Sequence, residues 1–289
     1  MVASEAVPFA KTGGLADVVG ALPHALAGLG HEVAVVLPLY RMVKLEKAAT
    51  LYPSLTIPLG TETRFASVHT VEQGGVKFYF VGYPLFFDRA ALYGTPAGDY
   101  PDNAERFALF CRAAVEIAQL DFRPDVIHCH DWQSALVPVL LRSVYARAPL
   151  LSRVPVLCTI HNLGYQGLFR RETLAEIGVP ESLFTPDNLE FYGKVNLLKG
   201  GLVFSDAINT VSRGYAREIQ TEEHGFGLDG LLRHRSLVLS GILNGVDYSH
   251  WDPATDKNLA ANYTPEDLRG KKKCKKDLLG QFGLSAENL

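Results

Sequence analysis

The chain has 289 residues, of which 47% are hydrophobic and 20% are charged, and its formal net charge is −3. This composition is typical of an ordinary globular protein, and the weak negative charge provides no field that would attract nucleic acid or an acidic membrane surface. The length suits one large α/β domain or two smaller ones.

The four cysteines are Cys111, Cys129, Cys158 and Cys274, and no two of them have the CxxC spacing of a zinc site or a thioredoxin motif. Cys129 and Cys158 lie in apolar runs, as expected for buried thiols in a reducing compartment. No apolar run approaches the ~20 residues of a membrane span, and no signal-peptide pattern opens the chain. We therefore expect a location in the cytoplasm or in an organelle stroma.

The predicted elements alternate between strands and helices from the start of the chain. Residues 1–5 leave room for only a short first strand before the loop at 8–14. The helical spacing of apolar residues predicts a helix over 16–29 that stops at Gly30. The valine-rich run at 32–40 predicts a buried parallel strand.

The rest of the chain continues this alternation. Apolar runs at 68–71 and 76–83 flank two glycines and predict a hairpin. Further strands are expected at 125–129, 156–160, 207–211 and 240–243. Helices are expected at 103–120, 134–148, 195–204, 213–220 and 271–282. The pattern predicts an α/β fold with a Rossmann-like, doubly wound and mostly parallel sheet, helices on both faces, and ligands beyond the carboxyl ends of the strands.

The loop Lys11-Thr12-Gly13-Gly14-Leu15 precedes the first predicted helix. Adjacent glycines let backbone N–H groups approach a ligand, a helix N-terminus favours anions, and Lys11 supplies a positive charge, so the loop is a candidate phosphate site. It matches neither the GxGxxG nor the GxxxxGK[ST] pattern. Judged alone, a glycine turn with a surface lysine explains the loop equally well.

His128, His130, Asp131 and Trp132 lie at the end of another predicted strand. Two histidines and an aspartate suggest a metal, but the sequence offers no third clustered ligand. We expect instead a polar lip in which Asp131 and Trp132 face a sugar, because carboxylates accept hydrogen bonds from hydroxyls and aromatic rings stack on sugar faces. A core histidine beside a packed tryptophan is the expected role of at least one of the two histidines.

His161 and Asn162 follow the next predicted strand, and Asn244 follows the last one. His161 can donate to a substrate hydroxyl, and Asn162 offers both a donor and an acceptor. A capping asparagine beside a structural histidine is the alternative interpretation. For Asn244, the following glycine makes an Asn-Gly pair, which by itself indicates only a turn.

Together these motifs resemble one family, the bacterial glycogen synthases and plant starch synthases. The resemblance covers nearly the whole chain and rests on KTGGL, YPDNAERFALF, HDW, HN followed by YQG, and LNGVD in this order. It implies the N-terminal domain of a GT-B fold, in which two Rossmann-like domains face each other across a cleft. It also implies transfer of glucose from ADP-glucose to the non-reducing end of an α-1,4-glucan with retention, without a metal or another cofactor.

By this resemblance, Lys11 would contact the nucleotide diphosphate, and Gly14 would let the loop backbone approach it. His161 would touch the donor glucose near the reacting centre, and Asn244 would hydrogen-bond the donor sugar. The acceptor side of the cleft would be shaped by Asp131, Asn162, Tyr100 and Glu5. The expected catalytic residues are His161, Lys11 and Asp131. The position after HDW, where many relatives carry histidine, is Gln133.

The resemblance also implies that the complete active site is shared between two domains. Residues 1–270 would form the N-terminal catalytic domain, and 271–289 would begin the link to a C-terminal nucleotide-binding domain. Because that domain would supply the adenine and ribose pocket, we expect the isolated chain to bind ADP-glucose weakly and to transfer little glucose. Two alternatives are a non-catalytic module that binds glycogen, starch or maltooligosaccharides, and a GT-B transferase that uses UDP-glucose. The family implies a bacterial cytoplasm or a plastid stroma.

Overall fold

The computed structural model describes residues 1–249 and 251–285, which fall into two compact units. The first unit runs from Met1 to Asn244, and the second begins at Gly245, earlier than the domain boundary expected after residue 270. In the second unit, helix α10 (Arg269–Gln281) agrees with the helix expected at 271–282. Within the described residues, no helix combines the length and the apolar character that crossing a membrane requires.

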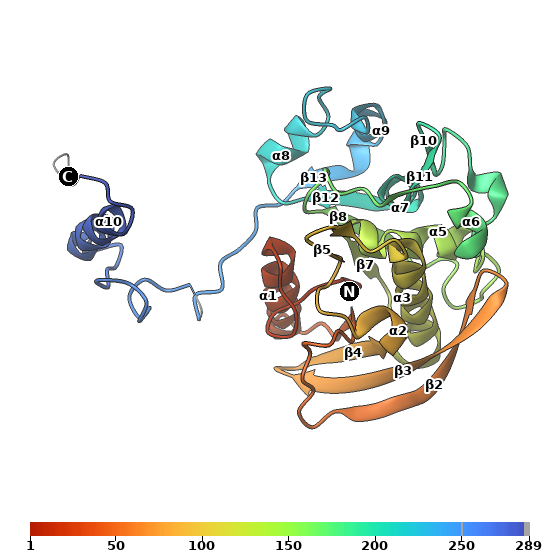
Figure 1. Ribbon diagram of the computed structural model, residues 1–289, viewed down its shortest axis with the longest axis horizontal. Helices are drawn as coiled ribbons and strands as arrows, with labels where there is room; N and C mark the ends of the chain where they lie inside the picture. The colour runs from red at the N-terminus through yellow and green to blue at the C-terminus, as the bar shows by residue number, and fades with distance from the viewer. Residues whose placement is uncertain (250, 286–289) are drawn as a thin grey trace. The chain divides into compact units, whose positions relative to one another are not determined.

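The first unit is built around one main sheet (Figure 1). One half has the strand order β2 (Ala49–Leu59), β3 (Glu62–Gln73), β4 (Val76–Gly82), β1 (Val33–Pro38). The other half has the order β7 (Ile127–His130), β8 (Val156–Ile160), β12 (Ala207–Thr210), β13 (Leu239–Gly241). The pairs β2–β3 and β3–β4 are antiparallel and the other pairs are parallel, so the expected mostly parallel sheet is confirmed.

The segment around Val2 joins the two halves of the sheet. Val2 forms parallel bridges to Val36 of β1 and to Cys129 of β7. Its N–H donates to the carbonyl of His128 at 2.8 Å, and its carbonyl accepts from the N–H of His130 at 3.1 Å. The short first strand expected at 1–5 is therefore the central strand, and the chain winds outward from it in both directions.

Helices cover both faces of the sheet, as the alternation predicts. Val19 of α1 (Gly14–Gly28) shares a core cluster with Val35 of β1. The neighbouring Val36 faces the opposite side and belongs to the cluster that contains α3 (Asn103–Ile117). Because side chains alternate along a strand, β1 is buried on both faces, which explains its continuous apolar, valine-rich sequence.

The helices beyond β7 pack with little space between them. Helix α7 (Leu197–Phe204) lies against α4 (Asp131–Ser134) and α5 (Leu136–Arg142). The close approach depends on Gly201, because a Cβ at this position would lie 2.5 Å from the Cβ of Ala135. This packing fixes the helices that follow the polar end of β7.

Some elements differ from the expectations. Strand β2 was not predicted, because Pro53 and Pro58 interrupt its sequence, and it is tolerated as an edge strand that is largely exposed. The helix expected at 134–148 ends earlier, at Arg142, and the one expected at 103–120 passes into a π-helical turn after Ile117. A small antiparallel sheet formed by β9 (Leu168–Phe169), β11 (Lys194–Asn196) and β10 (Glu190–Phe191) was also missed, because strands this short carry no periodic signal.

Shorter elements complete the first unit. These are α2 (Pro84–Phe87), β5 (Gly94–Thr95), β6 (Gly98–Asp99), α6 (Thr173–Glu176), α8 (Arg213–Glu218) and α9 (Asp229–His234), with short 3₁₀ turns at Glu181–Leu183 and Ser236–Val238.

The close packing of α7 leads to a stability prediction. We expect Gly201→Ala to lower the free energy of unfolding by about 1–3 kcal/mol, because the added methyl group overpacks the contact with Ala135. The matched control is Gly28→Ala in α1, where a Cβ would meet nothing within 4 Å. Urea unfolding at one pH measures both changes. Equal stability of the two variants would contradict the role assigned to Gly201.

Candidate active site

Polar residues follow the central strands of the main sheet, where strands are added on one side of Val2 by one part of the chain and on the other side by the next. The central strand at Val2 is followed by Glu5, β7 is followed by Asp131, and β8 is followed by His161. In doubly wound sheets, the crevice beyond the carboxyl ends of the strands at this switch point is the usual ligand site. The architecture therefore brings together three predicted residues that are far apart in the sequence.

Asp131 links the loops that follow β7 and β8. Its Oδ1 accepts a hydrogen bond from the backbone N–H of His161 at 2.7 Å and a weaker one from that of Asn162 at 3.4 Å. The side chain is buried, and its backbone φ of 55° lies in the left-handed region that few residues other than glycine, asparagine and aspartate adopt readily. Burial raises the pKa of this carboxyl to about 7, and the nearby Glu5 carboxylate adds to the rise.

Three histidines form a row beside Asp131, in which His130 is buried and His128 and His161 are half-buried. His130 Nδ1 lies 3.0 Å from His161 Nε2, and the His128 and His130 ring centroids are 4.0 Å apart. Burial lowers the pKa of all three rings, to about 4 for His161 and about 3 for His128. The rings are therefore neutral near pH 7. The contact with His130 engages Nε2 of His161, and no hydrogen bond of the described residues engages its Nδ1.

The Thr159 hydroxyl defines the protonation of His128. This hydroxyl donates to Oδ1 of Asn209, so it can only accept from His128, whose Nε2 lies 2.6 Å away. His128 is thus protonated on Nε2 and serves a structural role, as expected for at least one of the histidines.

Glu5 anchors the loop that carries Lys11. Its carboxylate is buried and accepts hydrogen bonds from the backbone N–H of Thr12 and from the Thr12 hydroxyl, the latter at 2.6 Å. The Tyr93 hydroxyl donates to the same carboxylate. Because these bonds satisfy Glu5 from two sides, the loop is held directly above the central strand.

Lys11 and Gly14 lie at the start of α1, as predicted. The Lys11 ammonium is exposed and pairs with Asp17 at 2.6 Å. Exposed ion pairs contribute little stability, so replacing Asp17 with a phosphate as the partner of Lys11 would cost little free energy. A Cβ on Gly14 would meet nothing within 4 Å, so the space in front of this 15-residue helix is open to a ligand.

Tyr100 is joined to the same network through Tyr93. Its backbone N–H donates to the Tyr93 carbonyl at 3.0 Å. Its ring contacts the guanidinium groups of Arg89, 4.7 Å from the ring centroid, and Arg106, 4.9 Å away. Arg106 is fully buried and is held by the carbonyls of neighbouring loops. The Tyr100 ring is therefore fixed by two cations.

Asn162 and Asn244 are placed less firmly. The Oδ1 of Asn162 accepts from the N–H of Gly164 at 2.9 Å, so its side-chain carbonyl has the capping role given as the alternative. The residue is exposed, which leaves its NH₂ group at the surface. Asn244 is exposed, follows β13, and is the last residue of the first unit. No described contact joins Asn244 to the network around Asp131.

The expected role of Trp132 is wrong. Its ring is buried, with centroids 5.0 Å from Phe107 and 5.7 Å from Phe169, and it packs against Gly167. The indole therefore belongs to the core and does not face a sugar. In the described part of the chain, no three histidine, cysteine or acidic side chains gather as metal ligands do.

Three contributors to the network were missed from the sequence. Thr12 and Tyr93 hold Glu5, and His130 contacts His161. Nothing in the spacing of Tyr93 pointed to Glu5, because the two residues are 88 positions apart. His130 carried the right signal, since it ends a strand, but the sequence could not decide which of the two histidines faces the site.

The fold, and the polar residues at the carboxyl ends of its central strands, define the chain as a Rossmann-like α/β domain with a polar ligand site at its switch point. The sequence matches the starch synthase catalytic domain family over residues 1–234, so the chain belongs to that family.

Named relatives agree with this assignment. The chain is 58% identical to a glycogen synthase of Koribacter versatilis and 50% identical to a glycogen synthase of Geotalea uraniireducens, over 99% and 98% of its own length. It spans 60% and 59% of those two proteins. A solved catalytic domain of starch synthase IV from Arabidopsis thaliana, bound to ADP and acarbose, matches with a TM-score of 0.85 and 35% identity over 100% of this chain and 59% of that one. The expected fold class, that of the N-terminal domain of a GT-B protein, is confirmed.

The raised pKa of Asp131 predicts a pH-dependent stability. A carboxyl with a folded-state pKa of about 7 binds its proton more tightly than in the unfolded chain, so it stabilises the fold at low pH and loses this contribution as the pH rises toward 7. Asp131→Asn removes the titration and keeps both the acceptor and the left-handed turn. Relative to the wild type, we expect the variant to gain about 2–3 kcal/mol between pH 5 and pH 8.

Urea unfolding of both proteins across this pH range makes the measurement. The histidines titrate in both proteins, so the difference between the two curves isolates Asp131. A difference that does not change with pH would show that the carboxyl has an ordinary pKa.

Proposed function

We propose that this chain is the acceptor-side half of a glucosyltransferase that moves glucose from ADP-glucose to the non-reducing end of an α-1,4-glucan. The observation that carries the proposal is the network of Glu5, Asp131 and His161 beside the Lys11 loop. A solved relative of the same fold is bound to ADP and acarbose, a nucleotide and a sugar-like ligand. The glycogen synthase relatives supply the same reaction class.

The proposed roles follow from the chemistry of each group. Lys11 and the N-terminus of α1 stabilise negative charge on the departing diphosphate, and Gly14 leaves room for its approach. His161 is neutral and half-buried, so its free ring nitrogen can hydrogen-bond the donor glucose without placing a cation beside it. No metal and no other cofactor enter this proposal.

The acceptor glucan would bind to the remaining predicted residues. Asp131 and Glu5 present buried carboxyl groups at the switch point, and carboxyl oxygens accept hydrogen bonds from sugar hydroxyls. The exposed amide of Asn162 and the ring of Tyr100, held by Arg89, would add further contacts. Asn244 is proposed as a donor-sugar contact on the family resemblance alone.

A C-terminal GT-B domain is the proposed partner. The chain spans about three fifths of its glycogen synthase relatives. By the family resemblance, the adenine and ribose pocket would lie in a C-terminal domain. We propose that the two domains together form the complete site. The bacterial relatives favour a cytoplasmic location.

The test compares the chain alone with the chain joined to the C-terminal part of the Koribacter versatilis relative. With radiolabelled ADP-glucose and maltoheptaose, we expect little incorporation by the chain alone and clear incorporation by the joined protein. In the joined protein, Lys11→Ala should lower kcat about 100-fold or more, because one preorganised cation is lost from the leaving group. Lys272→Ala, at an exposed lysine of α10, is the matched control.

Each result has a defined meaning. Strong incorporation by the chain alone would overturn the shared active site. A fully active Lys11→Ala variant would overturn the role of the loop. Incorporation from UDP-glucose in place of ADP-glucose would leave the reaction class intact and change the donor.

A further inference from the structure

The loop that follows β8 takes its path from side chains. The backbone N–H groups of residues 161–164 all donate to side-chain oxygens. The first two donate to Asp131, the third donates to the hydroxyl of Tyr215 at 3.0 Å, and the fourth donates to Asn162. Because neither a helix nor a sheet continues through these residues, the position of His161 depends on the groups that hold the loop.

Leu163 lies at the centre of this loop. The residue is fully buried, and both polar groups of its backbone are bound by side chains. Its N–H donates to Tyr215, and its carbonyl accepts from Nε2 of Gln166 at 3.2 Å. Gln166 is buried as well, and its Oε1 accepts from Nδ2 of Asn196 at 2.7 Å. The glutamine of the YQG motif therefore folds back onto the loop that carries His161.

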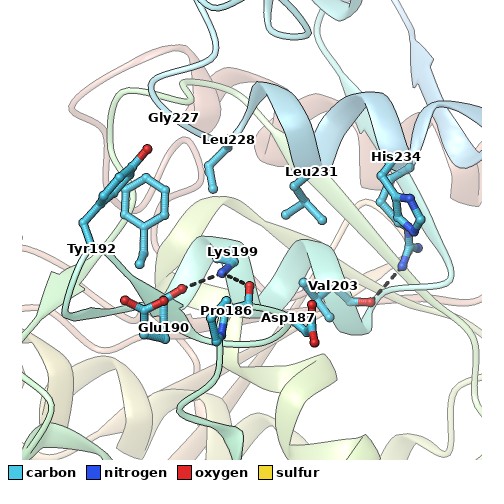
Figure 2. Close-up of a pocket in the computed structure, with 12 residues that line it drawn as sticks. Pro186, Asp187, Glu190, Tyr192, Lys199, Val203, Gly227, Leu228, Leu231 and His234 are labelled. Atoms are coloured by element: carbon cyan, nitrogen blue, oxygen red, sulfur yellow. Dashed lines mark hydrogen bonds between the residues drawn. The ribbon is translucent and has the colours of Figure 1, made fainter.

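The start of α7 holds Gln166 in place. Asn196 caps this helix, because its Oδ1 accepts from the N–H of Lys199 at 2.9 Å. Figure 2 shows Lys199 on the wall of a cavity of about 650 Å³, where its ammonium donates to the carbonyls of Pro186 and Glu190. The ammonium thereby ties α7 to the segment that leads into β10, so Asn196 is a fixed partner for Gln166.

Tyr215 is held by the helix that follows β12. Strand β12 pairs with β8 in parallel, so α8 begins at the same edge of the sheet as the loop after β8. The hydroxyl of Ser212 caps α8 by accepting from the N–H of Tyr215 at 2.9 Å. The Tyr215 ring is half-buried and packs against the core. A fixed element therefore presents its hydroxyl to Leu163.

Loss of the Tyr215 hydroxyl would leave the buried N–H of Leu163 without an acceptor. An unsatisfied buried donor is costly, so the chain would shift to find another partner. Leu163 directly follows His161 and Asn162, whose N–H groups both donate to Asp131. A shift of Leu163 would therefore turn these two N–H groups away from Asp131 and move the His161 ring.

We propose that Tyr215 is a positioning residue of the candidate active site. It fixes the N–H of Leu163 while Gln166 fixes the carbonyl, and together they keep the backbone of His161 bonded to Asp131. Tyr215 acts through His161 and not on the substrate. This proposal rests on the proposed function, because it gives the placement of His161 a role in glucosyl transfer.

The first measurement is hydrogen exchange of the backbone amides in the whole chain, followed by NMR. Tyr215→Phe removes one oxygen atom and keeps the ring. The matched control is Tyr145→Phe, which removes a half-buried hydroxyl that donates to Glu116 of α3 at 2.7 Å. The amides of His161 and Asn162 are the readout, because they donate to Asp131 and not to the tyrosine, and so report on the placement of the loop.

We expect the amides of residues 161 and 162 to exchange about 10-fold faster or more in Tyr215→Phe, and at the wild-type rate in Tyr145→Phe. The amides of β8 should keep their wild-type rate in both variants. A uniform rise that includes β8 would show a general loss of stability and would overturn the positioning role. Unchanged rates at residues 161 and 162 would overturn it as well.

The second measurement is glucose transfer by the chain joined to the C-terminal part of the Koribacter versatilis relative. Tyr215→Phe should lower kcat about 10-fold or more and change the KM for ADP-glucose by less than about 2-fold, because a misplaced His161 loses its contact in the transition state. Tyr145→Phe should change neither constant.

The two measurements separate the proposal from the proposed function. An active wild type with an equally active Tyr215→Phe variant would overturn the positioning role and leave the proposed function intact. A joined wild type that transfers no glucose would overturn the proposed function, and the exchange rates alone would then decide whether Tyr215 positions the loop.

Discussion

The pairing of the Val2 segment with both β1 and β7 is the constraint on which the site depends. These bridges join two four-stranded halves into one sheet and place Glu5, three residues later, at the point where the winding direction changes. Because the strands around this point are parallel, their carboxyl ends meet at one edge. Asp131, in the loop after β7, therefore lies close enough to Glu5 for the carboxylate to raise its pKa, and it accepts hydrogen bonds from the loop after β8, although both loops are more than 120 residues away from Glu5 in sequence.

Burial determines the charge state of this edge. The three histidines are neutral because their imidazolium forms would be poorly solvated, and the Asp131 carboxyl is held close to neutrality for the same reason. The positive charge near this edge lies instead on the exposed Lys11 and at the N-terminus of α1. The edge thus separates a weakly charged region, suited to sugar hydroxyls, from a cationic region suited to phosphates.

The aromatic residues of this unit divide between core and surface. Trp132, which follows the left-handed Asp131, packs in the core against Phe107. Tyr192 and Phe226, which have left-handed backbone angles themselves, keep their rings in solvent. An aromatic residue in a polar motif is therefore not by itself an indication that its ring meets a ligand.

The sequence by itself determined the fold class, the order of most strands and helices, and the segments that carry the candidate site. It could do so because buried parallel strands require continuous apolar runs, and ligand-binding loops require glycine and polar residues directly after them. It missed β2 and the small sheet of β9, β11 and β10, because prolines and strands of two or three residues give no periodic signal. Only the tertiary structure decided that Trp132 is buried, that Tyr93 and Thr12 hold Glu5, and that His130 contacts His161. The direction and the partners of a side chain depend on backbone angles and on contacts between distant segments, and the local spacing of residues determines neither the angles nor the contacts.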